Sequence, residues 1–164
     1  MPKSNLLDCI IMHNASKIQT RRKNLPKMSH TCILIFQNLL NAKYAFNIVI
    51  NTEYYLKQIY QSMESQNSEL LGSASLTLAA FCIYSHVKII SAITQYHVIT
   101  DTPRFKLVVD ALTVTKEGDQ GSVLKFINTI LSSTIISYRI HLRSELEQCK
   151  LSVIINIYTH SWIT

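Results

Sequence analysis

The side chains that could carry chemistry are widely separated in this sequence. Its six histidines include no pair at the H-x-x-x-H or H-E-x-x-H spacing that lets one helix face hold a metal ion. Its four cysteines include no C-x-x-C pair, which excludes the usual zinc and compact disulfide patterns. These residues are His13, His30, His86, His97, His141 and His160, with Cys9, Cys32, Cys82 and Cys149. We expect no metal site, and we expect Cys32 and Cys82 to be reduced core residues because they lie in apolar runs.

Signatures of catalysis and phosphate binding are also missing. The sequence contains neither a nucleophile elbow nor a cysteine-protease signature. It contains no G-x-x-x-x-G-K-[ST] or G-x-G-x-x-G loop, and only Gly118 and Gly121 lie close together. We therefore predict a binding protein rather than an enzyme, with no cofactor.

The composition favours long helices joined by short polar loops. Hydrophobic residues make up 48% of the chain and charged residues 16%, and there are only three glycines and three prolines. All-β folds with many tight turns need more of both. Because no uninterrupted run of 18 apolar residues and no secretory signal occur, we expect no membrane span and a cytoplasmic location.

The positive charge is concentrated near the N-terminus. The formal net charge is +6, and five cations lie between positions 17 and 27, namely Lys17, Arg21, Arg22, Lys23 and Lys27. Such a segment is more often a solvated arm than a specific binder. Binding of nucleic acid or anionic membrane through this arm stays open as an alternative function.

Apolar residues at helical spacing predict a series of helices. Ser29 is the expected N-cap of the first and Thr52 of another, and Asn67 or Ser68 caps a third. Residues 116–121 read as the clearest loop, and Pro103 as the first turn of a helix. The expected helices cover residues 29–40, 53–63, 69–84, 87–96, 103–112, 122–132 and 136–149.

Equivalent positions recur about every 40 to 45 residues, a period that is typical of armadillo repeats. Phe36, Ala80 and Ile127 occupy matching places in successive units. The expected fold is all-α, an armadillo-like, right-handed α-solenoid of about three repeats. We divide the chain into a basic arm at 1–28, the repeat domain at 29–151 and a tail at 152–164.

Five motifs over residues 29–151 resemble the formin homology 3, or diaphanous inhibitory, domain of diaphanous-related formins. Residues 78–84 are similar to its L-x-A-L-C helix, and residues 139–146 follow its RVHLRSE-L/F helix closely. Residues 126–129 match F/L-I-N-A, residues 41–46 are similar to MNNKFG, and residues 90–93 and 103–105 resemble its L-x-A-hydrophobic and RF segment. Ala45 and Lys150 stand where the family tends to have glycine, and an αL turn at Ala45 would be strained. The tail at 152–164 matches no family motif.

The resemblance implies a regulatory domain of the actin cytoskeleton, with a cytoplasmic, cytoskeleton-associated location. Its groove would hold the formin's own C-terminal autoregulatory helix, a Rho-family small GTPase would release it, and the formin's other half would act on actin. Carried over by motif position, the groove consists of Gln37, Asn41, Thr77, Ala80, Ile83, Tyr84, Lys125 and Asn128. No nucleic acid partner is expected.

Alternatives to this interpretation remain open. Ala80 and Ile83 suit the core between repeats as well as they suit a groove. For Arg139 and Arg143 we favour surface or inter-repeat pairs over contact with an acidic partner. Because much of the family's domain is missing, the chain is expected to be a fragment or short isoform, and a poorly folded, non-functional fragment is a further alternative.

Overall fold

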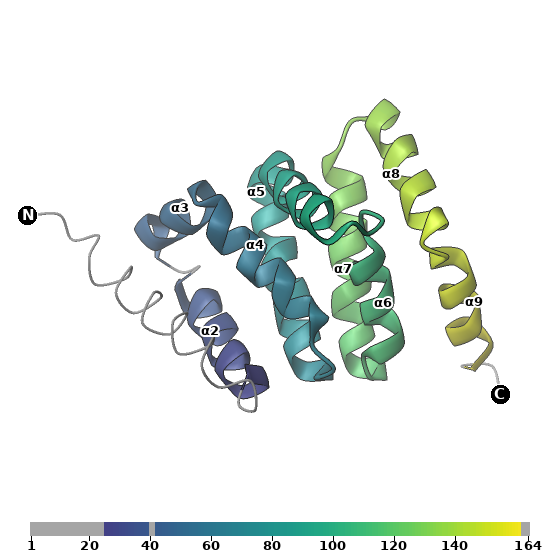
Figure 1. Cartoon of the computed structure of the whole chain (residues 1–164), viewed down its shortest axis with the longest axis horizontal. Coiled ribbons are helices and arrows are strands. Elements are labelled where there is room, and N and C mark those ends of the chain that lie inside the picture. The colour runs from purple at the N-terminus through teal and green to yellow at the C-terminus, as the bar shows by residue number, and fades with distance from the viewer. Residues whose placement is uncertain (1–24, 40–41, 162–164) are drawn as a thin grey trace, which may run out of the picture.

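The computed structural model describes residues 25–39 and 42–161, and this part of the chain contains helices and no strand. The helices form an elongated row, with α2 and α3 at one end and α8 and α9 at the other (Figure 1). Their bounds are α2 Leu25–Leu39, α3 Lys43–Asn51, α4 Glu53–Gln61, the 3-10 helix η1 Ser62–Glu64, α5 Ser68–Thr100, α6 Lys106–Val114, α7 Glu117–Ser133, α8 Ile136–Gln148 and α9 Leu151–Ser161. The fold is all-α and armadillo-like, as predicted.

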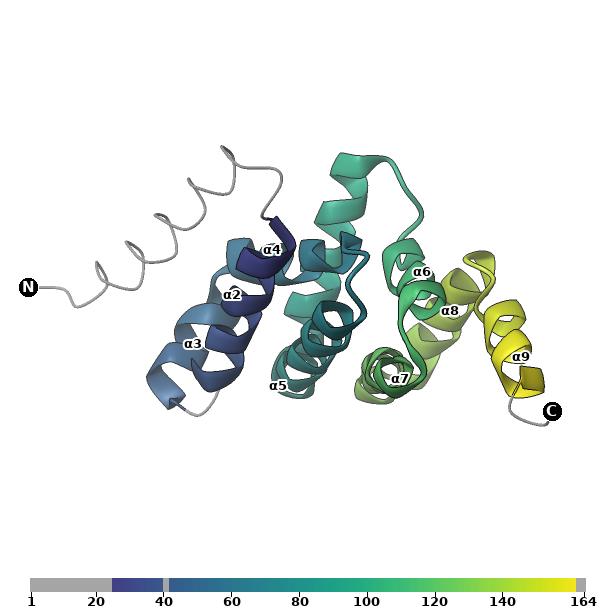
Figure 2. The same cartoon turned by 90° about the horizontal axis from the view of Figure 1, so that it is seen from below.

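The helices are arranged in two layers. The first half of α5 packs against α7 on one side and α2 on the other, and in Figure 2 it lies beside α7 with both seen nearly end-on. Helices α4 and α6 and the second half of α5 form the other layer. The outer sides of the first half of α5 and of α7 therefore face away from α4 and α6.

Helix α5 changes direction at Ser85, whose φ of −158° and ψ of 79° are not helical. The two helices expected at 69–84 and 87–96 are thus confirmed, with Ser85 as the joint that sends the second half into the other layer. Among the described residues, α5 is the one helix long and apolar enough to cross a membrane, although we expected no such segment. Half of the most apolar 18-residue segment of α5 is buried among the neighbouring helices. A core helix that packs on several sides has such a composition.

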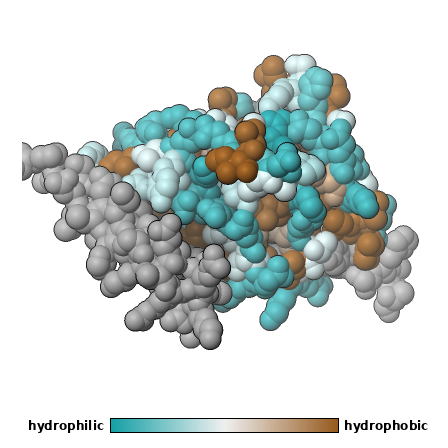
Figure 3. Space-filling model, viewed as in Figure 1, coloured by the Kyte–Doolittle hydropathy of each residue, from teal (hydrophilic) through white to brown (hydrophobic). Residues whose placement is uncertain are grey.

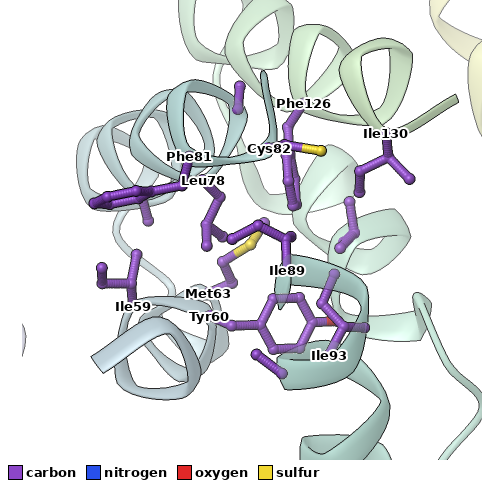
Figure 4. Close-up of a cluster of buried hydrophobic side chains, with 14 of the residues drawn as sticks. Ile59, Tyr60, Met63, Leu78, Phe81, Cys82, Ile89, Ile93, Phe126 and Ile130 are labelled. Carbon is purple, nitrogen blue, oxygen red and sulfur yellow. The ribbon is translucent and has the colours of Figure 1, made fainter. Parts of the chain in front are cut away.

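The core lies where α4, η1, both halves of α5 and α7 meet. Figure 4 shows these side chains interlocked, with Tyr60 and Met63 below Leu78 and Phe126 beside Cys82. The fully buried aromatic residues include Tyr60, Phe81 and Phe126. Cys82 is buried in this core as a free thiol, whereas Cys32 is only partly buried. Close packing of these side chains fixes the two halves of α5 relative to α7.

Several expected helix ends are wrong. The first described helix begins at Leu25, four residues before Ser29. Thr52 precedes α4, but its hydroxyl donates to the carbonyl of Ile48 rather than capping α4. The expected cap of α5 is confirmed: of the two candidates, Asn67 is the cap, because its side chain accepts a hydrogen bond from the backbone N–H of Leu70 at 3.1 Å. Pro103 lies in the turn before α6 rather than in its first turn.

The loop expected at 116–121 is wrong: residues 117–121 form the first part of α7, and Lys116 is the extended residue before it. Glu117 and Asp119 lie in its first turn, where carboxylates interact favourably with the positive end of the helix dipole. The Ser68 hydroxyl donates to Asp119 at 2.5 Å and accepts from the backbone N–H of Lys116 at 2.7 Å. These contacts with α5 outweigh the low helix propensity of Gly118 and Gly121.

Ala45 is not in a left-handed turn, as its resemblance to a family glycine suggested, but is buried within α3. Lys150, the other position at which the family tends to have glycine, does have a positive φ of 67°, between α8 and α9. A side chain in this conformation costs roughly 1 kcal/mol relative to glycine.

We expect Lys150→Gly to raise the free energy of unfolding by about 1 kcal/mol, measured by urea denaturation, because glycine adopts this turn without strain. Gln148→Gly, at the last residue of α8, is the matched control and should lower it by up to about 1 kcal/mol. If both substitutions lowered the free energy of unfolding, the backbone at Lys150 would not be strained.

A buried histidine joins α4 to the second half of α5 and to the turn that follows it. His97 is 4% exposed, and its ring shares hydrogen bonds with the Tyr60 hydroxyl at 2.7 Å and the Thr102 hydroxyl at 2.5 Å. Burial, and then the charge of Arg104, lower the pKa of His97. The folded chain therefore holds this imidazole neutral.

We expect acidification to destabilise the fold through His97. A group whose pKa is lowered on folding contributes stability that is fully present above its unfolded pKa, here near 6.5, and is lost as the pH falls toward its folded pKa. The melting temperature should thus fall between pH 7.5 and 5.5, and His97→Gln should flatten that dependence. His141→Gln, at an exposed position on α8, should leave the slope unchanged. Equal slopes for all three proteins would rule out His97 as the cause.

Candidate partner-binding groove

An apolar ridge runs along the outer side of the first half of α5. Leu76 is 40% exposed, Ile83 is 69% exposed and Ala80 between them is partly exposed. Their i, i+4, i+7 spacing places all three on one helix face. Ala80 and Ile83 are groove candidates that the structure places at an accessible surface. Leu76 was missed, although its spacing to Ala80 was visible in the sequence.

Two neighbouring side chains border this ridge. Gln37 is partly buried on α2, and its amide nitrogen donates to the carbonyl of Ser73 at 3.1 Å, which joins α2 to α5. Tyr84 is 72% exposed, and its ring meets Phe46 of α3 edge-on at 4.6 Å between centroids. Asn41, the remaining candidate near α2, lies outside the described residues.

Thr77 does not belong to this surface. Its side chain is 1% exposed, and its hydroxyl donates to the carbonyl of Ser73 at 2.7 Å within α5. The residue lies three positions from Ala80, but it points toward the packed side of the helix. The sequence-based assignment of Thr77 to the groove is therefore corrected.

Lys125 and Asn128 are both exposed on α7, the helix that packs beside the first half of α5. Together with Arg139 and Arg143 of α8 they line an open hollow of about 580 Å³ between α7 and α8. The opposite face of the molecule, over α4 and α6, is largely hydrophilic, with hydrophobic atoms in separate small groups (Figure 3). The candidate binding surface thus has two parts on neighbouring helices, an apolar ridge on α5 and a basic hollow between α7 and α8.

The pair of Arg104 and Glu145 fixes α8 to the rest of the stack. The Arg104 Nε donates to one Glu145 oxygen at 2.6 Å, its Nη2 pairs with the other, and its Nη1 donates to the Thr94 hydroxyl at 3.0 Å. Burial opposes the charge of Arg104, but the bonds to Glu145 and Tyr138 raise its pKa above the ordinary value. Glu145 is thus a scaffold residue, whereas Arg139 and Arg143 make no ion pair within the described residues.

The described residues contain no cluster of three or more metal-ligating side chains. Burial raises the pKa of the Cys82 thiol to about 11, which leaves it unreactive near neutral pH. Chemically, this surface is suited to holding a partner through apolar contacts, amide hydrogen bonds and positive charge.

Comparison with known proteins places these features in a family context. A family model described as the Diaphanous FH3 Domain matches residues 86–163. Inverted formin-2 of Xenopus laevis is 27% identical over 121 residues, which are 70% of this chain and 11% of that protein. Protein diaphanous homolog 3 of Rattus norvegicus is 24% identical over 142 residues, 84% of this chain and 12% of that protein. Formin-like protein 2 of Homo sapiens is 24% identical over 138 residues, 80% of this chain and 13% of that protein.

These similarities confirm the resemblance to diaphanous-related formins. The match to the family model includes residues 152–163, for which the sequence analysis found no counterpart. Helix α9 covers most of this segment and packs on α8 and α6. The chain spans about a tenth of the length of the curated relatives that it matches.

Proposed function

From its similarity to the Diaphanous FH3 domain, we propose that this chain is the partner-binding part of a formin regulatory domain. Its groove holds an amphipathic helix, the autoregulatory helix from the C-terminal half of a formin, and thereby keeps actin filament assembly off. A Rho-family small GTPase releases the helix because it binds more tightly to the domain without the helix than to the domain that holds it. The activity is binding rather than catalysis, in the cytoplasm at the actin cytoskeleton.

The observation that carries this proposal is the exposed ridge of Leu76, Ala80 and Ile83. An amphipathic helix binds a groove through apolar residues at i, i+3, i+4 and i+7, and this ridge offers the same spacing. Covering the exposed parts of Leu76 and Ile83 stabilises a complex by roughly 3 kcal/mol in total. The small side chain of Ala80 leaves room between them for a leucine of the partner.

Polar groups on α2 and α7, the helices on either side of the first half of α5, can orient a bound helix. On one side Gln37 is held by its hydrogen bond to α5, and on the other the exposed amide of Asn128 can bond to a partner backbone. The exposed ammonium group of Lys125 lies one turn from that amide on α7. An occupant is therefore apolar over α5 and polar over α7.

The proposal is tested by titrating the purified chain with a fluorescent peptide of the formin C-terminal autoregulatory segment. We expect saturable binding that persists at 300 mM salt, because the α5 contact is apolar. Binding through the basic N-terminal segment would instead weaken steeply with salt and would extend to nucleic acid or anionic vesicles. A chain with a helical circular dichroism spectrum that does not bind the peptide would refute the regulatory groove.

A further inference from the structure

We propose that the hollow between α7 and α8 binds the carboxylate side chains of the partner helix, so that this helix is apolar over α5 and acidic over α8. This inference rests on the proposed function and specifies the chemistry of the partner. The hollow is lined by Gly121, Leu124, Lys125, Asn128, Thr129, Leu131, Ser132, Arg139 and Arg143. Three of these side chains are cationic and none is acidic.

The three cations lack carboxylate partners within the described part of the chain. The ion pairs found there are Arg104 with Glu145 and Lys106 with Asp110, and both lie outside the hollow. Three like charges gathered around one depression repel one another, and an anion placed between them removes that repulsion. The hollow is thus complementary to negative charge.

Arg139 is held in place before any ligand arrives. Its Nη2 donates to the carbonyl of Thr134 at 2.9 Å and to that of Ser132 at 3.4 Å, and both carbonyls lie at the end of α7. Its Nε is buried and has no hydrogen-bond partner within the described residues. A guanidinium anchored in this way loses little conformational entropy when it meets an anion.

Arg143 follows Arg139 by one helical turn, and Lys125 and Asn128 face them from α7. Partly buried Leu124 and Leu131 line the same hollow and offer apolar contact to the methylene groups of a bound acidic side chain. The hydroxyls of Thr129 and Ser132 are engaged with carbonyls inside α7, so charge rather than hydroxyl bonding determines the specificity. Carboxylates form bidentate bonds with guanidinium groups and suit this set of donors.

The position of the hollow specifies where the acidic residues of the partner must lie. Packed helices lie roughly 8–10 Å apart, which places the gap between α7 and α8 about 14 Å from the α5 ridge. Because a helix rises about 1.5 Å per residue, the carboxylates follow or precede the apolar residues by about nine positions. An acidic peptide fits better than a nucleic acid, because the hollow holds only three cations rather than a long basic stripe, and α7, which lines it, packs beside α5 with its apolar ridge.

The test uses two helical peptides with the same apolar stripe. One carries three glutamates about nine residues from the stripe, and the other carries glutamines there. We expect the full chain to bind the glutamate peptide about tenfold more tightly at 100 mM salt. In the double variant Lys125→Gln with Arg143→Gln this preference should disappear, whereas Lys57→Gln with Lys106→Gln, which removes equal charge from α4 and α6, should retain it.

The relative affinities of the two peptides distinguish the possible outcomes. Equal binding of both peptides by the unmodified chain overturns the acidic-partner inference and leaves the apolar groove intact. No binding of either peptide overturns both the inference and the proposed function. A single-stranded oligonucleotide that binds more tightly than the glutamate peptide, and that is lost in the Lys125 and Arg143 variant, would identify a nucleic acid contact instead. Helical circular dichroism spectra confirm that the variants fold, and Arg139 is left unchanged because it supports the turn before α8.

Discussion

Ala80→Asp is expected to weaken binding of the autoregulatory peptide by about a hundredfold, which corresponds to roughly 2.8 kcal/mol. Ala80 lies in the middle of the exposed ridge, between Leu76 and Ile83. A bound helix would bury the new carboxylate against apolar side chains with no cation beside it, and an unpaired buried charge is costly. The measurement is fluorescence anisotropy of the labelled peptide with each protein.

The matched control is Val98→Asp, which places the same charge on an exposed apolar residue at the far end of α5. The second half of α5 belongs to the other layer, so this variant should bind the peptide as the unmodified chain does. Both variants should keep a helical circular dichroism spectrum, because both positions are accessible in the folded chain. Unchanged affinity of the Ala80 variant would eliminate the α5 ridge as the contact surface.

Gly72→Val is expected to lower the free energy of unfolding by about 2–3 kcal/mol. Gly72 lies in α5 where α7 approaches closely, and a Cβ added there would lie 2.8 Å from Asp119 Oδ1 and 3.2 Å from Asp119 Cβ. Asp119 cannot yield easily, because its other oxygen accepts the hydrogen bond from Ser68. A larger side chain must therefore separate α5 from α7 at the base of the groove.

Gly121→Val tests whether this cost comes from the helix contact rather than from the substitution itself. Gly121 is also helical, but a Cβ there has no heavy atom within 4 Å. Its substitution should change the free energy of unfolding by less than about 0.5 kcal/mol, because valine has a better helix propensity than glycine. Urea denaturation of both variants measures the difference, and equal effects would contradict the close approach at Gly72.

The helical fold of this chain and part of its core could be predicted from the sequence. Leu56, Ile59 and Tyr60 lie at helical spacing on α4 and are buried, because the period of a helix turns one face toward its neighbours. The extent of α8 was predicted to within one residue, since it depends on local periodicity. The family resemblance depended on short sequence motifs, one of which, at residues 139–146, lies in α8. The groove candidates Ala80, Ile83, Lys125 and Asn128 were carried over from the family resemblance, and the structure places them at accessible positions.

The contacts between the helices could not be predicted from the sequence. Residues 117–121 carry the composition of a loop, yet they fold as helix because Ser68 of α5 bonds to Asp119 and to the backbone of Lys116. Thr77 has the spacing of a groove residue, but the packing of α5 turns it inward. The cations of α7 and α8 are distant in the chain, and the joint at Thr134 and Ile135 brings them around one hollow. Each of these outcomes depends on contacts between segments far apart in the sequence, which local periodicity does not encode.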